Sequence, residues 1–163
     1  TEVISKYNFR EVITNHYTMP IGQAISLLAI KASESGQKYW CHIEDDWAAH
    51  RGLGVALELI KSPEVSQVRL RLDSEKVLDK HMITGESLVW KQEDGYKISP
   101  KAHLTFNPSI IKVEDIGKIF PCTGERAAQR NFLPHMKSVV QMTPGIFEHI
   151  GKESLRIKTG AEA

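Results

Sequence analysis

Two histidines, each followed two positions later by a threonine, are the residues whose types and spacing could do chemistry. His16 precedes Thr18, and His103 precedes Thr105. On a strand, positions i and i+2 share a face, so each pair would present an imidazole and a hydroxyl together. Two such pairs facing one hollow could act as general acid and base on a phosphodiester, with the threonines binding the phosphate. We therefore take His16, Thr18, His103 and Thr105 as the candidate catalytic residues.

The segment around His16 predicts a strand that turns abruptly into a helix. The strand rests on the β-branched residues at 12–14. The helix rests on Pro20 at its first turn and on apolar residues spaced along one face from 21 to 32. Because the backbone N–H groups of a helix N-terminus favour anions, this is a suitable place for a phosphorylated ligand.

The two motifs resemble the signature of the two-histidine phosphoesterase family, a pair of strands that each carry His-x-Thr/Ser. The resemblance implies a phosphodiesterase that acts on RNA or a cyclic phosphate. That family has a fuller strand and helix before its first motif, whereas fifteen residues precede His16 here.

A broader stretch, residues 10–115, resembles the ADP-ribosyltransferase fold. Its elements are the His16-Tyr17-Thr18 strand, an aromatic second strand with Tyr39 and Trp40, a third strand followed by a short helix, and a late strand over 102–106. The resemblance implies an NAD- or nucleotide-handling transferase with NAD as its cofactor. It also implies that His16 and Tyr17 lie at the ribose and that Tyr39 or Trp40 stacks on the base.

The late strand departs from that family. Its members carry there the glutamate that fixes the ribose hydroxyl, and this sequence has His103 in the nearest position. The departure leaves altered chemistry and ligand binding without transfer both open.

A metal site is not expected, although Cys41, His42 and residues 44–50 offer ligand types. Adjacent strand residues such as Cys41 and His42 point to opposite faces. The acidic residues at 44–46 suit the start of a helix. We therefore expect no metal cofactor.

Composition is that of an ordinary globular chain: 163 residues, 41% hydrophobic, 25% charged and a net charge of +1. No apolar run reaches the length of a membrane span, and two cysteines are too few for a disulfide framework. We expect a cytoplasmic protein without a membrane partner. Lysines and arginines between 126 and 158 make the last third the most basic. This leaves a third alternative, a non-enzymatic nucleic-acid or protein interaction domain.

The elements that must position these residues predict an α+β fold in one domain, residues 1–163. We expect a small curved mixed or antiparallel sheet flanked by helices in residues 10–115, with a helical C-terminal extension over 116–163. Predicted strands cover 38–43, 65–73, 102–106 and 110–113, and Gly95 favours a hairpin. Predicted helices cover 21 to about 36, 44–50, 55–60, 77–82 and 125–141, the last broken by Pro134.

Overall fold

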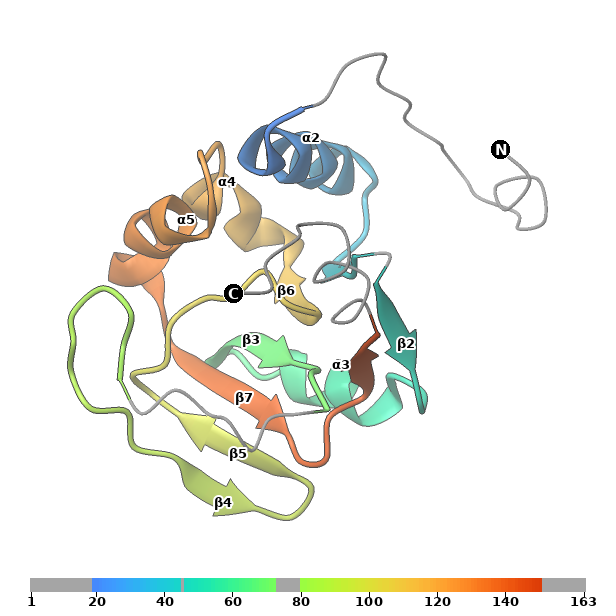
Figure 1. Cartoon of the computed structure of the whole chain (residues 1–163), viewed down its shortest axis with the longest axis vertical. Helices are drawn as coiled ribbons and strands as arrows, with labels where there is room; N and C mark the ends of the chain where they lie inside the picture. The colour runs from blue at the N-terminus through green and yellow to red at the C-terminus, as the bar shows by residue number, and fades with distance from the viewer. Residues whose placement is uncertain (1–18, 45, 73–79, 151–163) are drawn as a thin grey trace, which may run out of the picture.

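The computed structural model describes residues 19–44, 46–72 and 80–150 (Figure 1). The described part is α+β, as predicted, with helices around an open mixed sheet. Its elements in chain order are α2 (Ile21–Glu34), β1 (Tyr39–His42), β2 (Trp47–Ala49), α3 (Gly54–Ile60), β3 (Val65–Arg69), β4 (Lys91–Glu93), β5 (Tyr96–Ser99), β6 (Ser109–Lys112), α4 (Ile116–Ile119), α5 (Glu125–Phe132), β7 (Ser138–Met142) and β8 (Phe147–His149).

The main sheet has six strands in the order β1-β6-β3-β7-β5-β4. β3 pairs with β7 in parallel, and every other neighbouring pair is antiparallel. A separate ribbon joins β2 to β8. The central strand β3 therefore takes its neighbours from segments that come much later in the chain.

Helices cover both faces of this sheet. On one face, Val68 and Leu70 pack with Ala56 and Ile60 of α3. On the other, Ile111 packs with Ile25 of α2 and with residues of α4 and α5. Figure 1 shows α2, α4 and α5 grouped together and away from α3. The alternation of polar and apolar residues over 65–73 predicts a strand with one face exposed to water. This prediction is wrong, because both faces of β3 are covered and every one of its residues is buried.

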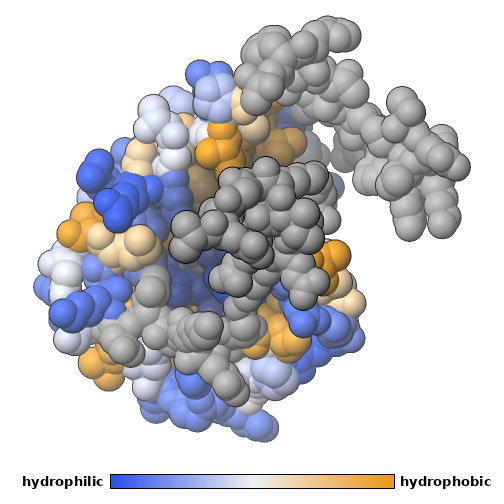
Figure 2. Space-filling view, viewed as in Figure 1, coloured by the Kyte–Doolittle hydropathy of each residue, from blue (hydrophilic) through white to orange (hydrophobic). Residues whose placement is uncertain are grey.

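Helix α2 follows Pro20, as predicted, and its end is fixed by glycine. Ser35 closes the helix, and Gly36 has a positive φ of 72° that a residue without Cβ adopts readily. The helix turns Ile25 and Ala29 into the core. It leaves Leu28 and Ile30 exposed, and Figure 2 shows hydrophobic surface over α2.

The predicted hairpin is also confirmed: β4 and β5 pair around Gly95, whose φ is 76°. Three other predictions are wrong. Residues 47–49 form a strand rather than a helix, because β8 supplies their partner. Residues 102–106 form no strand, although four of them are buried. The predicted helix over 125–141 ends at Phe132, and residues 138–142 become β7.

The predicted helical extension after residue 115 is therefore only partly helical. α4 and α5 occupy its first part, but β7 returns to the sheet between β3 and β5. Residues 77–79 of the helix predicted over 77–82 lie outside the described residues, and residues 80–82 are not helical. None of the described helices is long and apolar enough to cross a bilayer.

Candidate functional site

A pocket of about 470 Å³ opens beside Tyr39, at the edge of the sheet formed by β1 and β6. Its size lies in the range of small-molecule sites. Three segments line it: the start of β1, the loop after α3, and the end of β6. The lining residues are Gln37, Lys38, Tyr39, Lys61, Pro63, Lys112, Val113 and Glu114.

Strand geometry sets which residues of β1 face this pocket. Tyr39 is half-buried and packs against the cluster under α3, as Cys41 does. Lys112 is the cross-strand partner of Tyr39 on β6, so the two side chains lie on the same face. The pocket thus combines an aromatic ring held by the core with an ammonium held by the sheet.

Three lysines and one glutamate give the pocket an excess of positive charge. Lys112 Nζ donates to the carbonyl of Ser62 at 2.8 Å, which fixes it over the loop. Lys61 Nζ lies 2.6 Å from Glu58 Oε1, and this hydrogen bond raises the pKa of the Lys61 ammonium. Lys61 therefore stays charged at neutral pH.

A fourth lysine lies next to the pocket. Lys137 Nζ donates to the carbonyl of Pro63 at 2.6 Å, and Pro63 is itself a lining residue. Lysine ammonium groups thus bind successive carbonyls of the loop after α3.

Trp40, the other predicted base-stacking residue, lies on the opposite face of β1. The centre of its ring lies 5.5 Å from that of His42 and 5.7 Å from that of Phe120. Trp40 thus belongs to the hydrophobic cluster under α2, α4 and α5. Its role here is packing. The structure thus separates Tyr39 from Trp40, because neighbouring strand residues point to opposite faces.

His103 lies on that same opposite face and is buried, with 3% of its surface exposed. Arg69 Nη2 donates to the backbone carbonyl of His103. The centres of the His103 and His81 rings are 5.3 Å apart. Burial, with the nearby Arg69 charge, lowers the pKa of His103 to about 3. The imidazole is therefore neutral at physiological pH, and it lacks the imidazolium form that acts as a general acid.

Thr105 is occupied by structural hydrogen bonds. Its hydroxyl accepts from the backbone N–H of Asn107 at 3.2 Å and from its side-chain amide at 2.8 Å. Its backbone N–H donates to Gln67 Oε1 and its carbonyl accepts from Gln67 Nε2. Thr105 therefore holds a turn and a buried segment together.

The predicted site is thus divided. Tyr39 and His103 lie on opposite faces of the sheet, so they do not share one hollow. His16, Tyr17 and Thr18 lie outside the described residues. The pocket as a whole was missed because its lysines come from three separate segments. Lys38 precedes Tyr39 in the chain, but only the tertiary structure brings Lys61 and Lys112 to it.

Polar residues also form a row across the sheet on the His103 face. Paired positions place Ser109 beside His42, Arg69 beside Ser109, and Gln141 beside Arg69. Lys97 continues the row on β5. The alternation within residues 65–73 places Gln67 and Arg69 on one face, opposite Val68, but it does not predict that this polar face is buried.

Two of the metal-ligand candidates, Asp46 and His50, take part in ion pairs. Asp46 pairs with His149 at 2.9 Å, and His50 pairs with Glu148 at the same distance, across the β2–β8 ribbon. Within residues 19–44, 46–72 and 80–150, no group of three or more histidine, cysteine or acidic side chains could hold a metal ion.

Comparison of the chain with protein-family models, with curated proteins and with solved structures gives no match.

Proposed function

We propose that this protein binds a nucleotide, of the NAD or ADP-ribose type, in the Tyr39 pocket. One observation carries the proposal: a pocket of about 470 Å³ joins an aromatic side chain to three lysines. This combination suits the two chemically distinct halves of a nucleotide. We propose an ADP-ribosyltransferase-like domain that binds this ligand and whose chemistry differs from the usual transfer reaction.

Each part of the ligand has a suitable group in the pocket. The Tyr39 ring offers an apolar surface on which a base can stack. Lys38, Lys61 and Lys112 offer ammonium groups for the phosphates. Glu114 offers carboxylate oxygens that can accept hydrogen bonds from ribose hydroxyls.

The proposal assigns His103 no catalytic role. A transfer or phosphodiester step by this residue would need an imidazole that reaches the ligand and exchanges a proton. His103 is buried, neutral and on the other face from Tyr39. The two-histidine phosphodiesterase alternative gains no support from it.

The basic C-terminal third contributes Lys137 beside the pocket. This supports phosphate binding near Pro63. A longer polyanion such as RNA is the second candidate, and we expect it to differ from a mononucleotide by a steeper loss of affinity with salt.

Calorimetric titration with NAD, ADP-ribose and AMP tests the proposal. Tyr39→Leu keeps an apolar group against the core but removes the stacking surface. Lys61→Gln removes an exposed ammonium without disturbing the core. We expect each variant to weaken binding by about threefold to tenfold, a change of about 1 kcal/mol.

Lys91→Gln is the matched control. Lys91 lies 2.6 Å from Glu93, as Lys61 lies from Glu58, but it is on β4 and away from the pocket. We expect its affinity to equal that of the wild type. No binding by the wild type at millimolar ligand, or an equal loss in Lys91→Gln, would reject the proposal.

A further inference from the structure

Arg69 is a buried charge on the face opposite the Tyr39 pocket. It lies at the end of β3 and only 7% of its surface is exposed. Nη2 donates to the carbonyl of His103, but Nε has no hydrogen-bond partner among the described residues. Burying a guanidinium with a donor unused is costly, so an acceptor for this N–H is expected.

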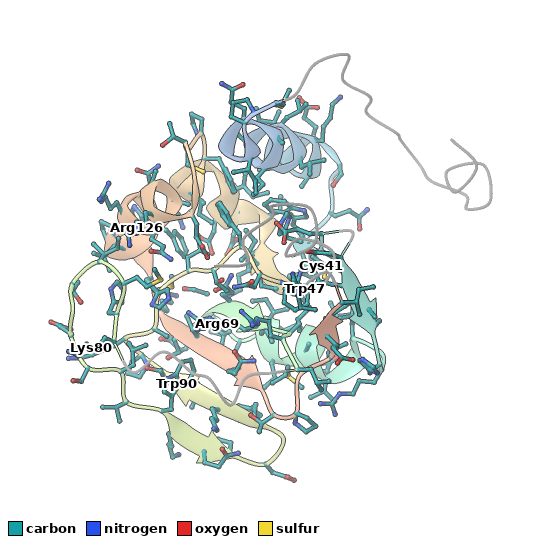
Figure 3. The ribbon with its side chains drawn as sticks, in the orientation of Figure 1. Cys41, Trp47, Arg69, Lys80, Trp90 and Arg126 are labelled. Atoms are coloured by element: carbon teal, nitrogen blue, oxygen red, sulfur yellow. The ribbon has the colours of Figure 1, made fainter. Side chains whose placement is uncertain are left out.

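Two further nitrogens near Arg69, on Trp90 and His103, lack hydrogen-bond partners among the described residues, and we call these three side chains the Arg69 cluster. The guanidinium lies over the ring of Trp90, 5.7 Å from its centre, and Figure 3 shows Trp90 approaching Arg69 from the side of β4. Trp90 Nε1 is buried and without a partner among the described residues, and so is Nδ1 of His103. An indole N–H can only donate. The cluster therefore offers donors and needs acceptors.

The charges around the cluster favour an acceptor that is negative. Burial lowers the pKa of Arg69 to about 10, so it stays protonated at neutral pH. Its charge is opposed by Arg71 and favoured by Glu125. One oxygen of Glu125 accepts from the backbone N–H of Phe106 at 2.9 Å, and neither oxygen of this carboxylate accepts a hydrogen bond from Arg69 Nε.

His81 extends the cluster as a neutral ring. Its Nδ1 lies 3.2 Å from the backbone N–H groups of Ile83 and Thr84, so it accepts both hydrogen bonds. This assignment puts the proton of a neutral ring on Nε2. His81 faces His103 edge-on and therefore adds no negative charge to the cluster.

We propose that Arg69, Trp90 and His103 form a binding site for an oxyanion, a phosphate or carboxylate group of a small ligand. Arg69 Nε–H and Trp90 Nε1–H donate to the anion, and His103 donates from Nδ1 as its neutral tautomer. The site lies on the other face of the sheet from the Tyr39 pocket, so it does not depend on the proposed nucleotide binding.

Nuclear magnetic resonance of the arginine Nε–H groups, with inorganic phosphate and acetate as probes, tests the site directly. A buried Arg69 Nε–H exchanges slowly and gives its own signal. We expect this signal to shift with saturation as either anion is added, and the melting temperature to rise over the same concentrations. The Arg69 signal is identified by its disappearance in Arg69→Lys. If Arg69→Lys does not fold, Trp90→Phe identifies the signal instead, because the loss of the indole over Arg69 shifts it.

Trp90→Phe and Trp47→Phe are a matched pair of variants. Each tryptophan lies under an arginine, with Arg71 5.4 Å from the ring of Trp47. The indole N–H of Trp47, however, already donates to Glu44 at 3.4 Å. We expect Trp90→Phe to weaken anion binding about tenfold, the loss of one hydrogen bond to a charged group, and Trp47→Phe to leave it unchanged.

Three outcomes would overturn the proposal. One is an Arg69 signal whose chemical shift does not change when phosphate or acetate is added. Another is equal loss in the two tryptophan variants. The last is an Arg69 signal that responds to phosphate or acetate only in the triple variant Asp73→Asn/Glu75→Gln/Asp79→Asn. In that case a carboxylate of the chain itself would be the anion that Arg69 binds in the wild type.

Discussion

Gln67 does for residues 102–106 what a neighbouring strand does elsewhere in the sheet. Its amide donates to the carbonyl of Thr105 at 2.7 Å, and its oxygen accepts from the N–H of the same residue at 3.1 Å. Gln129 adds a bond to the carbonyl of Leu104. Buried backbone groups must be paired, so side chains here replace the missing ladder. This explains how a strand-like sequence is buried without becoming a strand.

Gln67→Met should therefore destabilise the protein by about 3 kcal/mol, because it leaves a buried N–H and C=O of Thr105 unpaired. Urea denaturation measures the change. Gln92→Met is the control, since Gln92 is exposed on β4 and bonds only to nearby carbonyls. A loss below about 1 kcal/mol for Gln67→Met would show that Thr105 finds other partners.

His103 should make the protein less stable in acid. The unfolded histidine takes up a proton near its ordinary pKa of 6.5, whereas folded His103 stays neutral down to about 3. Between these values the unfolded state binds more protons, so the free energy of unfolding falls as pH falls. His42 and His81, whose pKa values burial also lowers, act in the same direction.

Denaturation midpoints at about pH 7 and about pH 5 measure this dependence. His103→Gln removes one titrating group and should make the dependence shallower. His135→Gln is the control, because His135 lies exposed after α5. An unchanged slope in His103→Gln would contradict the assignment.

At the scale of elements, local signals predicted what local interactions decide. The helix after Pro20 and the hairpin at Gly95 follow from residues within a few positions of each other. Residues 47–49 and 138–142 become strands because distant segments, β8 and β3, pair with them. The aromatic character of Tyr39 makes it a candidate from the sequence alone. Lys61 and Lys112 could not be connected with it, because their approach to Tyr39 depends on the tertiary structure.

Helix α2 depends on one glycine for its docking. A Cβ on Gly22 would lie 2.3 Å from the backbone carbon of Thr123, so the helix or the loop must move. Gly22→Ala should cost about 2 kcal/mol, as overpacked sites do. Gly117→Ala in α4 meets nothing within 4 Å and should gain up to about 1 kcal/mol.

Thermal or urea unfolding of these two alanine variants tests the close approach of α2 to the loop. Both changes add one methyl group to a helical glycine. Equal stabilities for the pair would mean that α2 sits farther from Thr123 than the structure shows.

At the scale of the molecule, β3 is the centre of the fold. It lies between β6 and β7 in the sheet and between two helical layers, and all of its residues are buried. β4 lies at the sheet edge with two exposed residues in three. Stability is therefore expected to fall from the centre of the sheet to this edge.

Amide hydrogen exchange should follow that gradient. The amides of Val68, Ile110 and Val140 should be the slowest, with protection close to the global free energy of unfolding. Those of β4 and of the β2–β8 ribbon should exchange orders of magnitude faster. Uniform protection across the sheet would contradict this ranking.

The pairing of β3 with β7 also affects how the chain folds as it is made. While a ribosome is still adding residues 70 to 137, the edge of β3 that pairs with β7 stays open, because Val140, the partner of Val68, has not yet been made. An open edge of this kind invites wrong associations. Translation that pauses within this interval should therefore leave a nascent chain that depends on chaperones until β7 emerges.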